Sequence, residues 1–92
     1  MKTIVGEKYK DGDLRVWWIP QVPGKAFRVP VATPAKAKKL LSVFADYDLF
    51  QFKNKIKPDY CNAGGLEIFE HDDWNEWHDE DGNDIDGHEV QL

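Results

Sequence analysis

The sequence predicts an α+β fold, in which a mostly antiparallel β-sheet carries one helix packed on one face. Short stretches of alternating apolar residues occur in both halves of the chain, and Gly-containing turn signals separate them. Between them, residues 34–47 carry apolar side chains at helical spacing. The expected order is βββ, helix, loop and ββ(β), with about five to six strands in a single domain over residues 1–92.

The first three predicted strands precede the helix. Residues 3–9 and 14–19 flank Asp11-Gly12, a pair typical of a type I′ hairpin turn, in which both central positions need a positive φ. Every position along 14–19 carries a bulky side chain, so both faces of that strand should be partly covered. In the third strand, 26–32, Pro30 cannot donate to a ladder and therefore indicates a sheet edge.

The helix should begin at Thr33-Pro34, with Thr as N-cap and Pro at the first helical position, and end at about Tyr47. Its apolar positions follow the i, i+3, i+4, i+7 spacing: Ala37, Leu40, Leu41 and Phe44. Its charges oppose the helix dipole, because three lysines lie near the start and Asp46 and Asp48 near the end. Either a solvated lysine face tolerates this arrangement, or the lysines meet acids from the C-terminal third or from a partner.

The rest of the chain should form a long loop and then short strands. Pro58 and Gly64-Gly65 indicate that the loop reaches from about 48 to 65, with a helical turn at its start. Strands 66–70 and 74–78 should pair through a tight turn at 71–73. Asp81-Gly82 signals a second turn, which would pair 74–78 with a short strand near 84–85. Residues 88–92 should fray.

Charge divides the chain in two. Of its 12 basic and 17 acidic residues, every Lys and Arg lies in 1–60, whereas 61–92 hold eleven acids and no base. Such asymmetry indicates an interaction surface or pairing between the two halves. The acidic hairpin region, 66–86, could imitate a polyanion or be only a solvated surface. Its candidate partner-binding residues are Glu70, Asp72, Asp73, Glu76, Asp79, Glu80, Asp81, Asp84 and Asp86.

The residue pattern argues against an enzyme. Ser42 is the only Ser and lies in the predicted helix, and Cys61 has no His near it in sequence. No glycine-rich phosphate loop is present, no register around Gly82 or Gly87 fits a calcium loop, and no spacing matches a closed zinc site. We therefore expect no catalytic residue, no metal and no cofactor. The N-terminus does not read as a signal peptide and no run is long enough to span a membrane, so a cytoplasmic protein is expected.

Aromatic and polar residues outside the acidic region form a second candidate surface. Core packing is the favoured explanation of each Trp, but an exposed indole beside basic and amide side chains could stack a base or anchor a partner. The candidates for contact with a partner or a small nucleotide are Arg15, Trp17, Trp18, Gln51, Asn54, Lys57, Tyr60, Asn62 and Trp77.

Three stretches resemble a known family: "VWWIPQVP" (16–23), "ADYDLFQFKNKIKPDYCNAGGLEIFE" (45–70) and "WNEWHDEDGNDID" (74–86). The chain resembles, from about 14 to 86, small phage and prophage proteins described as superinfection exclusion proteins. The resemblance implies a phage- or prophage-encoded protein that interferes with another phage or with host defence. It transfers no catalytic or binding residue.

The leading hypothesis is a small non-catalytic protein that blocks a protein partner of the host or of a competing phage. The acidic region would steer it to a basic surface and Trp residues would anchor it. One alternative is a sponge for a small signalling nucleotide, and another is a regulatory or structural factor of a mobile element. An acidic tail argues against direct nucleic-acid binding. An exposed Trp or the Pro30 edge would also support a homodimer.

Overall fold

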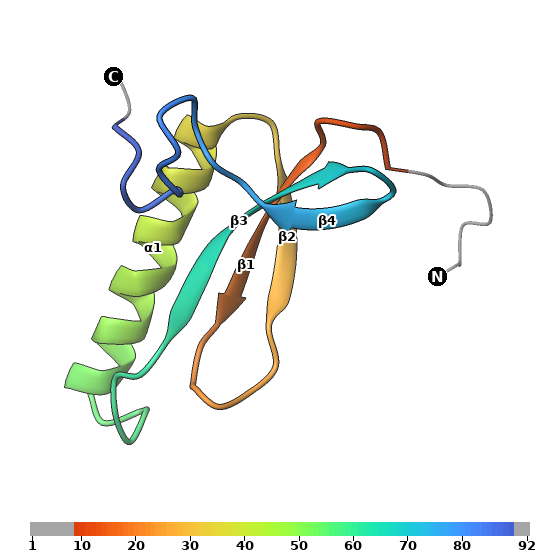
Figure 1. The fold of residues 1–92 in the computed structure, drawn as a ribbon. Coiled ribbons are helices and arrows are strands. Elements are labelled where there is room, and N and C mark those ends of the chain that lie inside the picture. Colours follow the sequence, from red (N-terminus) through yellow and green to blue (C-terminus); the bar gives the residue numbers. More distant parts are fainter. Residues whose placement is uncertain (1–8, 90–92) are drawn as a thin grey trace.

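The computed structural model describes residues 9–89, which form a four-stranded antiparallel sheet with one α-helix against one face (Figure 1). The strands are β1 (Leu14–Ile19), β2 (Phe27–Val31), β3 (Ala63–Glu70) and β4 (Asp73–Glu76), and α1 (Pro34–Lys53) lies between β2 and β3 in sequence. Their order in the sheet is β2-β1-β3-β4. The predicted α+β class is confirmed, with four strands in place of about five to six. No helix in this part of the chain is long and apolar enough to cross a membrane.

Two of the expected strands are not seen. The first, 3–9, lies outside the described residues except for Tyr9, which is not in a strand, and both sides of β1 are occupied by β2 and β3. The Asp11-Gly12 turn forms, but only Gly12 has a positive φ (97°), as in a type II turn and not in type I′. The second, near 84–85, is absent because Ile85 is buried in the core from an irregular segment.

The helix starts as predicted and ends later. The Thr33 hydroxyl accepts a hydrogen bond from Lys36 N at 3.1 Å, and Pro34 follows it. The end predicted at Tyr47 is wrong, because the helix continues to Lys53 and Asn54 is its C-cap. No Gly or Pro interrupts 35–53, so nothing in that stretch stops the helix. Asp48 is thus an interior helical residue.

Strand β3 also begins earlier than predicted, so the loop is shorter at both ends. Gly64 and Gly65 belong to β3, where they pair with Trp18 and Trp17 of β1. A Cβ on Gly64 would lie 2.2 Å from Trp18 Cε3, and one on Gly65 would lie 2.6 Å from Trp17 Nε1. The two glycines therefore make room for one indole on each face of the sheet.

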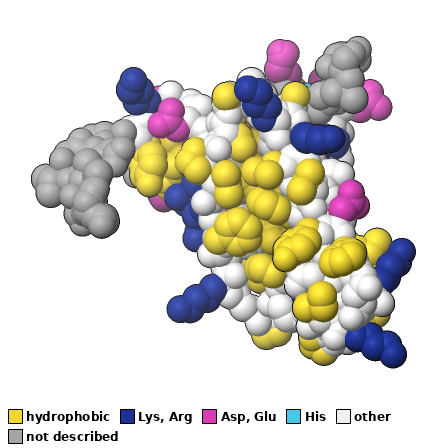
Figure 2. Space-filling model, turned by 180° about the vertical axis from the view of Figure 1, so that it is seen from behind, with side chains coloured by type: hydrophobic (Ala, Val, Ile, Leu, Met, Phe, Trp, Pro, Cys, Tyr) yellow, Lys and Arg dark blue, Asp and Glu magenta, His cyan; other side chains and the backbone are white. Residues whose placement is uncertain are grey.

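The core lies between the sheet and α1. Val16, Trp18 and Leu66 from the sheet, Ala37 from α1 and Ile85 from the C-terminal segment are its buried apolar residues. Strand β2 is at the edge of the sheet, as Pro30 predicted. Figure 2 shows that apolar side chains also gather on the outside of the molecule, in a central area with Lys and Arg side chains at its margin.

Candidate functional site

The acidic region divides into two clusters. One is the tip of the β3–β4 hairpin, where His71 and Asp72 both have a positive φ (56° and 63°), so the predicted tight turn is present. The other is the irregular segment 77–89, which lies beside α1 on the other side of the molecule (Figure 1). The region is therefore not one continuous hairpin, because the chain leaves the sheet after Glu76.

Asp79 organises the second cluster. Its carboxylate accepts hydrogen bonds from the backbone N–H groups of Asp81 and Asn83, both at 2.9 Å, and lies 2.8 Å from His88 Nδ1. Gly82 N donates to the Asp79 carbonyl at 3.0 Å, and its φ of 84° confirms the predicted turn. The His88 hydrogen bond, followed by that of the Asn83 backbone, lowers the pKa of Asp79 from its ordinary 3.8 to about 2.

Two further contacts fix this segment to the body of the protein. Trp77 N donates to the Leu66 carbonyl at 3.0 Å, and the Trp77 ring packs partly buried against the core and edge-on against His88 at 5.1 Å. Lys38 of α1 donates to the backbone carbonyls of Asp86 and His88. This lysine thus meets the C-terminal third through carbonyls and not through carboxylates. His88, the first residue expected to fray, is held here, whereas 90–92 lie outside the described residues.

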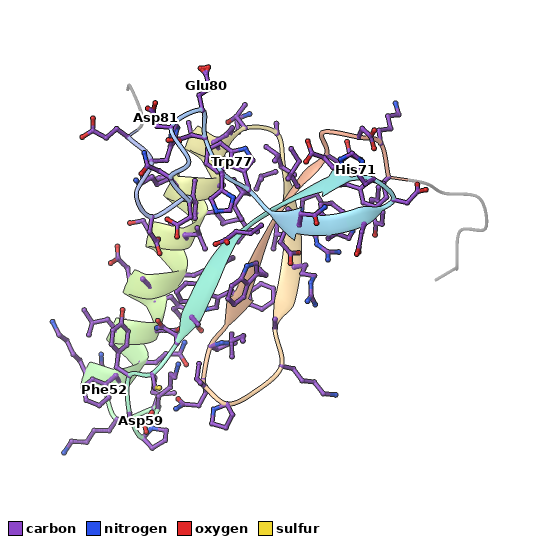
Figure 3. All side chains as sticks on the ribbon, viewed as in Figure 1. Phe52, Asp59, His71, Trp77, Glu80 and Asp81 are labelled. Carbon is purple, nitrogen blue, oxygen red and sulfur yellow. The ribbon has the colours of Figure 1, made fainter. Side chains whose placement is uncertain are left out.

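The nine candidate acids fall into two kinds. Asp73, Asp79 and Asp84 bind backbone N–H groups of their own turns. The other six are exposed, and Figure 3 shows Glu80 and Asp81 at the outer end of the segment. Within residues 9–89, none of the nine forms an ion pair with Lys or Arg; the nearest partner of Glu76 is His78, at 3.4 Å.

The stability contribution of Asp79 should depend on pH. Because the pKa of Asp79 is lower in the folded state than in the unfolded state, this contribution is fully present above pH 3.8 and is lost as the pH falls through about 2. In urea unfolding followed by Trp fluorescence, Asp79→Asn should be less stable than the wild type at neutral pH, and this difference should shrink from pH 3.8 downward and be mostly gone at about pH 2. His88→Gln should weaken the pH dependence, because the hydrogen bond with His88 is the largest cause of the lowered pKa of Asp79. A difference that persists unchanged at pH 2 would contradict this assignment.

The sheet face opposite α1 carries a second group of charged and aromatic residues. Arg15 Nε lies 2.7 Å from Glu67 Oε1, and the Arg15 guanidinium lies 4.0 Å from the centre of the Trp74 ring. Arg28 Nε approaches the same Glu67 oxygen at 3.9 Å. Arg15, Arg28 and Trp74, with Tyr9, line an open cavity of about 410 Å³. Trp17 is half-buried on this face, above Gly65.

The other aromatic and polar candidates lie on the α1 side, and several converge on Asp48. The buried Asp48 carboxylate accepts hydrogen bonds from Trp18 Nε1 at 3.0 Å and Asn62 Nδ2 at 3.1 Å, and lies 3.4 Å from Lys57 Nζ. Lys57 also donates to the Pro20 carbonyl.

Three more candidates bind the backbone. Asn54 Nδ2 donates to the Phe50 carbonyl at 2.8 Å, Tyr60 OH donates to the Ala45 carbonyl at 3.3 Å, and the Gln51 carbonyl accepts from two backbone N–H groups after the helix. The structure does not bring these residues together with Arg15 and Trp17, because the sheet lies between the two groups.

Sequence reasoning missed Asp48, Glu67 and Arg28 as site residues. Asp48 lies on the same helix face as Ala37, Leu41 and Phe44, and this spacing could have predicted that its side chain is buried. The Arg15–Glu67 pair required the β1–β3 register, and no sequence pattern supplies it.

Comparison with known proteins gives two matches. The sequence profile described as superinfection exclusion gene product 17 matches residues 13–91. A superinfection exclusion protein of Salmonella phage P22 is 44% identical over 80 residues, which cover 73% of this chain and 78% of that relative. No solved structure matches the chain.

Proposed function

This chain belongs to the superinfection exclusion gene product 17 family, as its sequence resemblance predicted, and from that premise we propose that it excludes a second phage by binding and blocking a protein partner in the infected host. The proposed contact surface is the outer end of segment 77–89, with Glu80, Asp81 and Asp86. The proposed partner presents a basic surface, of the kind that binds nucleic acid. The protein performs no bond-making chemistry in this proposal.

The observation that supports the proposal is an exposed acidic surface on a fixed backbone. The three side chains are exposed and form no ion pair with a Lys or Arg among residues 9–89. Asp79, with His88, holds the backbone that carries them. A fixed backbone loses little conformational entropy when a partner binds, and clustered charges of one sign speed the encounter with an oppositely charged surface.

Neutralising this surface should weaken exclusion. We expect the triple variant Glu80→Gln, Asp81→Asn, Asp86→Asn to bind its partner about 3- to 150-fold more weakly, at roughly 0.2–1 kcal/mol for each exposed charge. The plating efficiency of a challenging phage on cells that express the variant should rise accordingly. Asp79 and Asp84 stay unchanged, because their carboxylates hold the turns.

The matched control neutralises the other acidic cluster. Glu70→Gln with Asp72→Asn removes charge from the hairpin tip and should leave exclusion unchanged. Equal losses in both variants would indicate an effect of net charge alone. Full exclusion by the triple variant, at equal protein level and equal melting temperature, would reject the proposed surface.

A second candidate function is sequestration of a small nucleotide, and the cavity bordered by Arg15, Arg28, Tyr9 and Trp74 favours it. Guanidinium groups bind phosphate, and aromatic rings stack on bases. Native mass spectrometry of protein freshly purified from infected cells separates the two candidates. A bound small mass would favour the sponge, and a co-purifying polypeptide would favour the blocking protein.

A further inference from the structure

Helix α1 and edge strand β2 present a continuous apolar surface to the outside (Figure 2). Val43, Tyr47 and Phe50 follow one stripe of α1 at the i, i+4, i+7 spacing, and their exposed fractions are 47%, 61% and 55%. Phe27 of β2 is 44% exposed and packs edge-on against Phe44 at 5.2 Å. A chain of this size needs its aromatic residues for its core, so large exposed side chains on one surface indicate an interaction site.

This surface is hollowed along the line where α1 meets β2. One hollow of about 400 Å³ lies between Pro30 and Val31 on β2 and Leu40 and Val43 on α1. A second, of about 380 Å³, lies between Phe27 and Tyr47. We call these two hollows together the α1–β2 groove. An apolar groove that follows a helix suits the apolar face of another helix.

The charges around the groove are basic. Lys36 and Lys39 line its first hollow, and neither forms an ion pair within residues 9–89. The carboxylate that borders the second hollow, Asp48, is buried and lies beside Lys57. Lys36 also lies in the first turn of α1, at the positive end of the helix dipole, which disfavours a positive charge there. An acidic partner would offset this cost.

We propose that the α1–β2 groove docks an amphipathic helix of a partner protein, with its apolar face on Val43 and Tyr47 and its acidic residues beside Lys36 and Lys39. Charge complementarity selects this occupant. In a twofold pairing of two copies, Lys36 and Lys39 would approach each other or the basic end of the second helix at Lys53, so a second copy is disfavoured. Addition of a strand to β2 is limited by Pro30, which has no N–H to donate. The groove is separate from the acidic surface proposed above.

The first experiment tests whether the groove is needed without being structural. The double variant Val43→Asp, Tyr47→Asp should raise the plating efficiency of a challenging phage about 10- to 100-fold, while its melting temperature stays within about 2 °C of the wild type, because both side chains are exposed. The matched control is Phe52→Asp with Ile56→Asp, two exposed apolar residues that do not line the groove. Unchanged exclusion by the Val43, Tyr47 variant, or equal loss in the control, would overturn the proposal.

The second experiment identifies the occupant. The photo-crosslinking residue p-benzoylphenylalanine is introduced at position 47, or at 43 if the first variant does not fold, with position 70 on the hairpin as the off-groove control. We expect one crosslinked polypeptide, attached through a peptide with net negative charge and helical apolar spacing. Lys36→Glu with Lys39→Glu should lower the crosslink yield about tenfold.

Three outcomes would overturn the proposal: a crosslink to a second copy of this chain, a crosslinked peptide without net negative charge, or a yield that does not exceed that at position 70. The Glu80, Asp81, Asp86 triple variant should still crosslink at position 47. Its crosslinking therefore distinguishes failure of the groove from failure of the acidic surface.

Discussion

Replacing Asp48 with Ala should lower the free energy of unfolding by about 3–5 kcal/mol, which is what removal of one member of a buried ion pair costs. The side chains of Asp48 and Lys57 are only 4% and 10% exposed. Without the carboxylate, the Lys57 ammonium loses its counter-charge, and Trp18 Nε1 and Asn62 Nδ2 lose their acceptor. Urea unfolding followed by Trp fluorescence measures the change. The total free energy of unfolding of a small domain is about 5–15 kcal/mol, so this loss is a large fraction of it.

Matched variants separate charge from hydrogen bonding. Asp48→Asn keeps an oxygen that can accept from Trp18 and should therefore be less destabilised than Asp48→Ala. Adding Lys57→Met to Asp48→Asn removes the unpaired ammonium and should restore part of the stability. If Asp48→Ala cost less than about 1 kcal/mol, water would be reaching the site and the ion pair would not be buried.

The same network shows why the helix and its charges were predicted only in part. Helical spacing and the Thr33-Pro34 start located α1, because these signals are local in sequence. The predicted end at about Tyr47 is wrong, and Asp48, which the sequence places near that end, lies inside the helix. Whether an acidic residue is buried depends on its partners, and Lys57 and Asn62 reach Asp48 from beyond the helix.

The two candidate surfaces differ in how far the sequence predicts them. The sequence predicts the acidic region because its acidic residues lie close together along the chain. Its division into a hairpin tip and a loop fixed by Asp79 depends on hydrogen bonds from backbone N–H groups to a side chain, which composition does not reveal. The α1–β2 groove was not predicted. Its helical stripe of Val43, Tyr47 and Phe50 is the same kind of pattern that a core-facing stripe gives, and only the position of the sheet shows which stripe is covered.

Replacing Gly64 with Ala should destabilise the fold by about 3 kcal/mol, at the upper end of what overpacking usually costs. The new Cβ would lie 2.2 Å from Trp18 Cε3 and 3.0 Å from the Trp17 carbonyl oxygen. The indole cannot move aside easily, because Trp18 is 6% exposed and its Nε1 donates to Asp48. Thermal and urea unfolding measure the loss. The Gly64-Gly65 pair predicts a loop from sequence, whereas in the structure both glycines belong to β3 and leave room for the two indoles.

Gly87→Ala is the matched control, because its Cβ would meet Asn83 at an ordinary 3.5 Å and should change stability by less than about 1 kcal/mol. The cause of the Gly64 effect can be tested by making space for the methyl group. Trp18→Leu removes the ring that the new Cβ would strike, so Gly64→Ala should cost less in that background than in the wild type. If the two losses in free energy of unfolding are additive, the clash with the Trp18 indole is not the reason for the glycine at position 64. The glycine would then be needed for its backbone conformation or for the close approach of the Trp17 carbonyl oxygen.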